Sequence, residues 1–199
     1  MTEESRPAGT ADAAESADAA DPDRERSYGG VVGAFPYAFR SSESWLFRSY
    51  ALVGGAAAAA LAVLFALALV QLMGATAEAR FSVVRAFFIL VGLAAVAPTV
   101  GPVLFVARAH RRGDPVPSRA YDAALGVAGY VFLLSLYLGV VAAMPATFQL
   151  DGETVARPPP SGAFAPAVGF LYALPSVAGL VVPTLGAALV VGVHRLFRS

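Results

Sequence analysis

Two motifs of the same composition interrupt apolar runs: PTVG at residues 98–101 and PTLG at residues 183–186. Proline lacks an N–H and crowds the carbonyl four residues before it, so these motifs free the carbonyls of Ala94 and Gly179. A free carbonyl in lipid is costly unless another group satisfies it, and the threonine hydroxyls are the nearest candidates. The candidate kink site comprises Pro98, Thr99, Gly101, Pro183, Thr184 and Gly186.

Both motifs are predicted near the middle of a bilayer. Pro98 lies ten residues before Arg108, and Pro183 lies eleven before His194. At about 1.5 Å per helical residue this is roughly 15–17 Å, or half of a hydrocarbon core of about 30 Å. Two interpretations remain open. The prolines are either packing kinks in a helix bundle or a midplane substrate site, because transporters bind substrates at broken helices.

Other reactive groups are sparse. The absence of cysteine excludes disulfides and thiolate metal sites. No carboxylate is predicted deep in an apolar run, and we expect Asp122 to form a local ion pair with Arg119 or to favour a helix N-terminus. The two histidines, His110 and His194, stand in arginine-rich clusters and lack the acidic companions of a hydrolytic metal centre. We therefore expect no catalytic residues, no metal site and no cofactor.

Composition indicates an integral membrane protein. The chain of 199 residues is 57% hydrophobic and 14% charged, and its mean hydropathy is +0.65. Soluble domains have about 45–50% apolar and about 25% charged residues. A soluble fold could not bury this much apolar surface, so the class of soluble enzymes is excluded.

Four apolar runs reach the roughly 20 residues that a helix needs to cross a bilayer. Backbone groups in lipid must be satisfied within the segment, so each run is predicted to be helical. The fold class is therefore all-α, a membrane-embedded bundle of four transmembrane helices in a domain covering residues 50–199. The predicted spans are residues 50–73, 86–107, 121–144 and 168–193.

Arginine placement predicts the orientation. The segments that precede span one, join spans two and three, and follow span four hold eight arginines, whereas the alternate loops hold three. Positive residues favour the cytoplasmic side, so both termini are predicted to be cytoplasmic and the protein to lie in the cell membrane. The larger set is Arg40, Arg48, Arg108, Arg111, Arg112, Arg119, Arg195 and Arg198.

Two segments precede the spans. Residues 1–28 hold eight of the 14 acidic residues and almost no large apolar residue, which predicts a disordered acidic cytoplasmic tail. Residues 29–49 mix aromatic residues with arginine and are predicted to be an interfacial segment at the headgroup level. Ser42 is a candidate cap for a short helix there.

The spans suggest a duplication. Arg48 and Tyr50 recur 71 residues later as Arg119 and Tyr121, and the Pro-Thr-x-Gly motifs recur at a spacing of 85. This pattern is compatible with two tandem helical hairpins in the same orientation. The alternative is that unrelated helices share interface anchors and kinks.

The acidic, alanine-rich, lysine-free composition resembles that of small uncharacterised multi-pass membrane proteins of halophilic archaea. The resemblance is compositional and implies no activity. The leading functional hypothesis is a non-enzymatic scaffold or a subunit of a membrane assembly. The alternative is a small transporter or channel subunit that binds at the kink site. The expected partners are the lipid bilayer and other membrane subunits or a second copy, with no nucleic acid.

Overall fold

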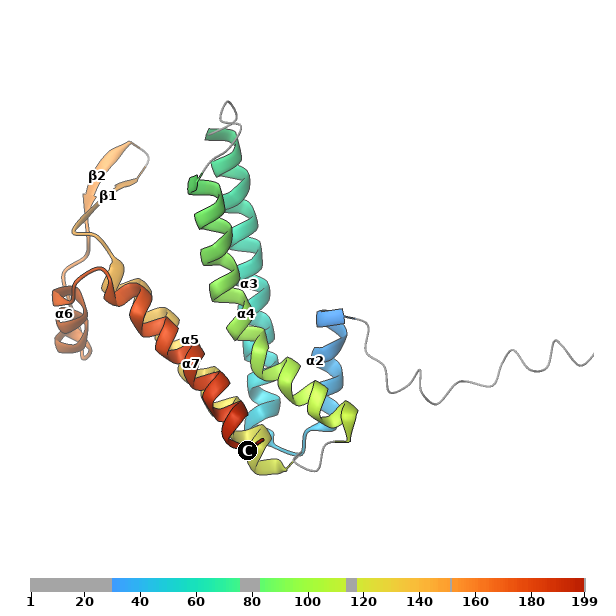
Figure 1. The fold of residues 1–199 in the computed structure, drawn as a ribbon. Coiled ribbons are helices and arrows are strands. Elements are labelled where there is room, and N and C mark those ends of the chain that lie inside the picture. Colours follow the sequence, from blue (N-terminus) through green and yellow to red (C-terminus); the bar gives the residue numbers. More distant parts are fainter. Residues whose placement is uncertain (1–29, 76–82, 114–117, 151, 199) are drawn as a thin grey trace, which may run out of the picture.

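The structure is a computed structural model that describes residues 30–75, 83–113, 118–150 and 152–198. The predicted disordered tail, residues 1–28, lies outside the described residues. Within them the fold is all-α apart from one short hairpin (Figure 1). The elements are α2 (Gly30–Ser41), α3 (Trp45–Ala75), α4 (Val83–Arg112), α5 (Arg119–Ala143), β1 (Thr147–Leu150), β2 (Glu153–Ala156), α6 (Ala165–Ala173) and α7 (Ala178–Leu196).

Four helices, α3, α4, α5 and α7, are long and apolar enough to cross a membrane. This confirms the predicted class. The first three predicted spans each lie within one helix to within a residue or two, although α4 continues beyond its span, through the arginine-rich segment to Arg112.

The fourth predicted span, residues 168–193, differs from the structure because it is divided between α6 and α7. The division falls at Pro175, and Leu174 is extended with φ −71° and ψ 149°. A residue before proline is driven out of the helical region, so α6 ends there. Only α7, with 19 residues, is long enough to cross.

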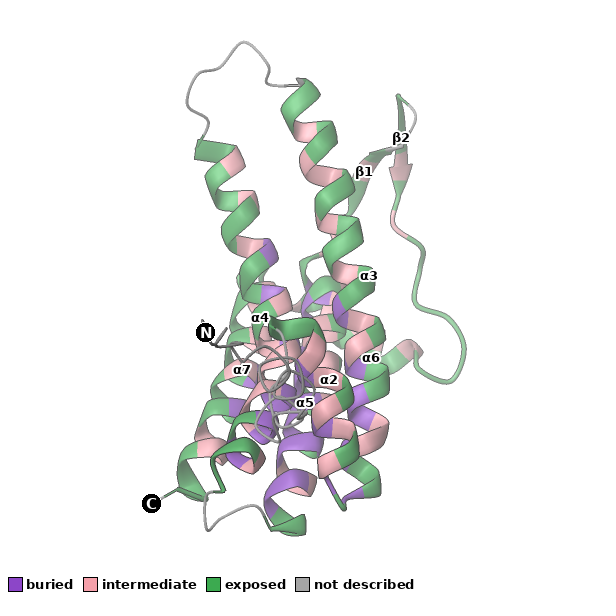
Figure 2. Ribbon diagram, turned by 90° about the vertical axis from the view of Figure 1, so that its right-hand side faces the viewer, coloured by how far each residue is buried: buried purple, intermediate pink, exposed green. Residues whose placement is uncertain are grey.

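The chain folds as two helical hairpins, α3–α4 and α5–α7. Figure 1 shows that the hairpins meet near the C-terminus and diverge toward the opposite end. The buried residues gather where they meet (Figure 2). The largest fully buried side chains include Tyr50, Tyr121, Phe47, Phe132 and Leu125. The helices α4 and α7 end here, and α3 and α5 begin here. We call this the arginine end, because arginines lie at each of these four helix ends.

Within the predicted interfacial segment, residues 30–41 form α2, residues 42–44 connect the helices, and residues 45–49 are already the start of α3. Helix α2 rests on α3 and α4, with Ala34 and Ala38 buried. The role predicted for Ser42 falls to Ser44, whose Oγ accepts a hydrogen bond from the N–H of Phe47 at 3.3 Å and so caps α3. Ser42 instead accepts from the N–H of Ser44 at 3.2 Å, after α2 has ended.

Glycine sets how closely α5 approaches its neighbours. A Cβ placed on Gly126 would lie 3.1 Å from Cα of Phe47, and one on Gly129 would overlap the ring of Tyr50. On the α7 side, a Cβ on Gly139 would lie 2.7 Å from Pro183 Cγ. Small residues allow such contacts between membrane helices. These three positions therefore require glycine for α5 to pack as it does.

Arg157 connects the loop between α5 and α6 to residues at both of its ends. Strands β1 and β2 pair antiparallel, with Thr147 opposite Ala156. Arg157 Nη1 donates to the carbonyl of Met144 at 3.1 Å, just beyond the end of α5. Its guanidinium lies 4.0 Å from the centre of the Tyr172 ring on α6. Arg157 therefore links the end of α5 to α6 across this loop.

We expect Gly129→Ala to destabilise the protein, because the added methyl group would displace the Tyr50 ring. Overpacking of this kind costs about 1–3 kcal/mol. Thermal unfolding in detergent measures the loss. Gly192→Ala is the matched control, since a Cβ there meets nothing within 4 Å. Equal melting temperatures for the two variants would contradict the close approach.

Candidate functional site

The first kink of the predicted site lies in the core. Thr99 is fully buried, and its Oγ1 donates to the carbonyl of Ala95 at 2.8 Å. The hydroxyl of Tyr50, on α3, donates to the carbonyl of Thr99 at 2.6 Å. Figure 1 shows α4 bending along its length, and Pro98 and Pro102 lie inside this helix. The first motif therefore lies at a bend in α4, which a buried hydrogen bond from Tyr50 of α3 stabilises.

Tyr50 also connects this bend to α5. Its ring meets the Tyr130 ring edge to face, with centroids 5.3 Å apart and an interplanar angle of 77°. The Tyr130 hydroxyl donates to Ser49 Oγ at 3.0 Å. Two hydrogen bonds and the contact between the two tyrosine rings thus join α3, α4 and α5 in the core.

The second kink has different surroundings. Thr184 is exposed, and its Oγ1 donates to the carbonyl of Leu180 at 2.7 Å. Pro183 packs against Gly139 of α5, and Gly186 is buried against Ser135 of the same helix. The second motif therefore serves the contact between α5 and α7.

The structure does not bring the two threonines into one site. Thr99 faces the core and Thr184 faces outward. Each hydroxyl bonds the carbonyl four residues before its own threonine, not the Ala94 or Gly179 carbonyl that the sequence suggested. The Gly179 carbonyl instead faces Gly139, 2.8 Å from the place of its missing Cβ. Between α4 and α7, a Cβ on Gly101 would lie 3.9 Å from Val190, and Phe105 stacks on His194 nearer the arginine end.

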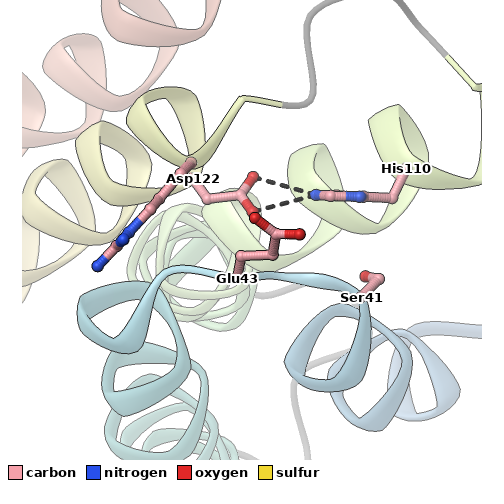
Figure 3. Close-up of a pocket in the computed structure, with 5 residues that line it drawn as sticks. Ser41, Glu43, His110 and Asp122 are labelled. Carbon is pink, nitrogen blue, oxygen red and sulfur yellow. Dashed lines mark hydrogen bonds and ion pairs between the residues drawn. The ribbon is translucent and has the colours of Figure 1, made fainter.

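A polar pair that the sequence analysis did not predict lies at the arginine end. His110 Nε2 is 3.0 Å from Oδ2 and 3.3 Å from Oδ1 of Asp122 (Figure 3). Asp122 is 1% exposed and His110 is 17% exposed. Asp122 lies in the first turn of α5, so the expectation that it favours a helix N-terminus is confirmed. The alternative expectation of an ion pair with Arg119 is wrong, because Asp122 pairs with His110, which therefore does have an acidic partner.

The second histidine is held by the neighbouring residue of α5. His194 Nδ1 lies 2.8 Å from the hydroxyl of Tyr121. The His194 ring stacks on Phe105, with centroids 4.1 Å apart and planes 9° apart. Consecutive residues in the first turn of α5 thus bond the chain's two histidines, one from α4 and one from α7. This turn fixes both helix ends.

A pocket of about 260 Å³ opens beside the His110–Asp122 pair. It is formed where the end of α2, the turn after it, the end of α4 and the start of α5 meet. Its lining residues are Ser41, Glu43, His110, Arg119 and Asp122. In the part of the chain that the structure describes, no group of three or more histidine, aspartate or glutamate side chains has an arrangement that could hold a metal ion. The pocket offers donors and acceptors of both charge signs for a polar ligand.

A signal for this pair exists in the sequence. His110 lies two residues before the end of α4, and Asp122 lies three residues after the start of α5. A short connection between antiparallel helices places such positions side by side. The identity of the partner depends on how each helix is rotated about its axis, and hydropathy does not define that rotation.

We expect His110→Gln and Asp122→Asn each to lower thermal stability, because each leaves a partly or fully buried polar group without its partner. Hydrogen bonds to charged groups contribute about 1.5–3 kcal/mol. In a double-mutant cycle the two losses should be strongly non-additive. Glu43→Gln, at an exposed position in the same pocket, is the control and should change stability little. Additive losses would show that the pair does not couple.

We expect Tyr50→Phe to destabilise the bend in α4 by about 1 kcal/mol, since it removes the only side-chain donor that the structure places on the Thr99 carbonyl among the described residues. Tyr137→Phe is the control, because Tyr137 is 65% exposed. The measurement is the melting temperature of each variant in the same detergent. Indistinguishable losses would rule out a stabilising role for the Tyr50 hydroxyl.

Comparison with known proteins identifies a family. The family model described as "Domain of unknown function (DUF8056)" matches residues 2–198. No curated protein and no solved structure matches the chain. The resemblance to membrane proteins of halophilic archaea stays a prediction. Because the match covers nearly the whole sequence, the chain belongs to the DUF8056 family.

Proposed function

We propose that this chain is a non-enzymatic, multi-pass membrane protein that acts as a scaffold or as a subunit of a membrane assembly. The observation that carries the proposal is an exposed face of α3. This helix rises away from α5 and α7 in Figure 1, and only 11% of its most apolar stretch is buried, as in the shorter α7, against 28% for α4 and 39% for α5. Helix α3 is therefore long and apolar but contributes little of its surface to the fold.

The exposed face has a regular spacing. Its residues follow one another at intervals of four and three, the spacing that keeps side chains on one side of a helix. All are exposed, and three are alanines. We call it the alanine face, and it comprises Leu52, Ala56, Ala59, Val63, Ala66 and Val70.

Exposed apolar surface alone does not distinguish a partner helix from lipid, because lipid tails solvate leucine as well as a helix does. Small residues do distinguish them, since they let a second backbone approach closely and gain van der Waals contact. This chain uses the same device inside the fold, where Gly126 and Gly139 admit α3 and α7. The alanines of α3 support a helix as the occupant of this face.

The proposed setting is the cell membrane, with both termini cytoplasmic. It rests on the excess of arginine at the arginine end, because positive residues favour the cytoplasmic side. The proposed partners are lipid and other membrane subunits or a second copy, without nucleic acid. The alternative of a transporter or channel subunit gains no support, because Thr99 is buried while Thr184 is exposed.

The test is the effect of a bulky residue on the alanine face. The tagged full-length protein, extracted from native membranes in a mild detergent, should migrate as a complex larger than a monomer. Ala59→Trp should convert it to a smaller species, because the indole would separate the two backbones. Leu64→Trp is the matched control, since Leu64 is 62% exposed and lies about 140° around the same helix.

Cysteine cross-linking adds a second measurement, which the absence of native cysteine makes straightforward. Ala59→Cys should form cross-linked adducts in native membranes, and Leu64→Cys should not. A wild-type protein that is monomeric in its membrane, with equal and low cross-linking at both positions, would contradict the proposal.

A further inference from the structure

The pocket at the arginine end is lined by two side chains of opposite charge, Glu43 and Arg119, that do not form an ion pair with each other. Glu43 and Arg119 both line it and both are exposed. Among the described residues the one ion pair within 4.0 Å at this pocket joins His110 to Asp122. The carboxylate of Glu43 and the guanidinium of Arg119 are therefore separated by more than contact distance. An acidic and a basic group face the same space without bonding each other.

The pocket also has a fixed wall. Asp122 is almost completely buried and is held by His110, so its carboxylate keeps one position. Figure 3 shows Asp122 and Glu43 approaching the pocket from different elements, α5 and the turn after α2. Ser41 Oγ, at the end of α2, adds a hydroxyl that bonds the Ala38 carbonyl only weakly, at 3.4 Å. The lining offers an acceptor from Glu43 and donors from Arg119 and Ser41, while the carboxylate of Asp122 is already paired with His110.

The volume selects for a small molecule. A space of about 260 Å³ exceeds what one water needs, since a cavity of about 10–15 Å³ on the same measure holds a water. It is smaller than the typical site of a drug-sized ligand, which is roughly 300–1,000 Å³. A simple anion would meet two carboxylates, and a simple cation would meet a guanidinium. A ligand carrying both charges would satisfy both sides.

We propose that this pocket binds a small zwitterion. Its ammonium group contacts the Glu43 carboxylate, with Asp122 behind it, and its phosphate or carboxylate contacts the Arg119 guanidinium. Arginine is suited to the anionic group because its planar fork matches the geometry of phosphate and carboxylate oxygens. Two sources carry this chemistry, namely the headgroup of an amine-bearing phospholipid and a free zwitterion such as an amino acid.

The experiment uses the full-length protein in detergent and sn-glycero-3-phosphoethanolamine as the probe, with binding measured by calorimetry. We expect saturable binding, and we expect Glu43→Gln and Arg119→Gln each to weaken it about tenfold, because each removes one charged hydrogen-bonding partner. Both residues are exposed, so neither change should alter the melting temperature. Arg108→Gln is the matched control, an exposed arginine at the same end that does not line the pocket.

The probe set isolates the requirement for both charges. Glycerol 3-phosphate lacks the ammonium group, ethanolamine lacks the anion, and glycerophosphocholine has no N–H to donate, so all three should bind more weakly. Glycine tests the free zwitterion, and nanodiscs with and without phosphatidylethanolamine test the lipid headgroup. Binding that depends on Glu43 and Arg119 with either source supports the proposal and identifies the source. Glu43→Gln and Arg119→Gln variants that bind as well as wild type, or no binding by any zwitterion, would overturn it.

Discussion

The packing of this protein depends on how closely α5 can approach its neighbours. Gly126 and Gly129 bring it against α3, and Gly139 brings it against Pro183 and the Gly179 carbonyl of α7. Any side chain at these positions would push the helices apart. At the arginine end the first turn of α5 then reaches the two histidines, through Tyr121 and Asp122. Helix α5 thus makes both the closest backbone contacts and the side-chain bonds to the histidines of α4 and α7.

The same constraint accounts for the shape of the molecule. The buried side chains and the hydrogen bonds of Tyr50 and Tyr130 join all the membrane-crossing helices where the hairpins meet. Beyond the bend in α4, contacts remain within each hairpin and the two hairpins diverge (Figure 1). Lipid or a partner must cover the α3 surface that is left. The proline motifs contribute to this architecture by bending α4 and by seating α7 on α5.

Much of the fold follows from composition and length. An uninterrupted apolar run of helical length has few alternatives in a bilayer, so α3, α4 and α5 could be predicted. The division between α6 and α7 could not be read from hydropathy, because the apolar run continues on both sides of Pro175. The extended conformation of Leu174 marks the division between the two helices. Its signal in the sequence is the proline that follows, because proline disfavours the helical conformation of the residue before it.

The candidate site was harder to predict. Counting residues places both proline motifs at similar depth, but depth does not say which way a side chain points. Thr99 turned inward and Thr184 outward, since helix rotation is set by packing against α3 and α5. The pairing of His110 with Asp122 depends on the same rotation. The sequence places both residues beside the arginine-rich segment between spans two and three, but the contact between them depends on the structure.

The central claim is that the two hairpins are held together at the arginine end and diverge at the other. Pulsed electron paramagnetic resonance on the otherwise cysteine-free chain in nanodiscs measures this directly. Spin labels replace Leu46 and Val127 near the arginine end, or Val70 and Val140 near the opposite end, all exposed positions on α3 and α5. The structure predicts a clearly longer distance for the second pair. Equal distances for the two pairs would show a parallel bundle and contradict the account.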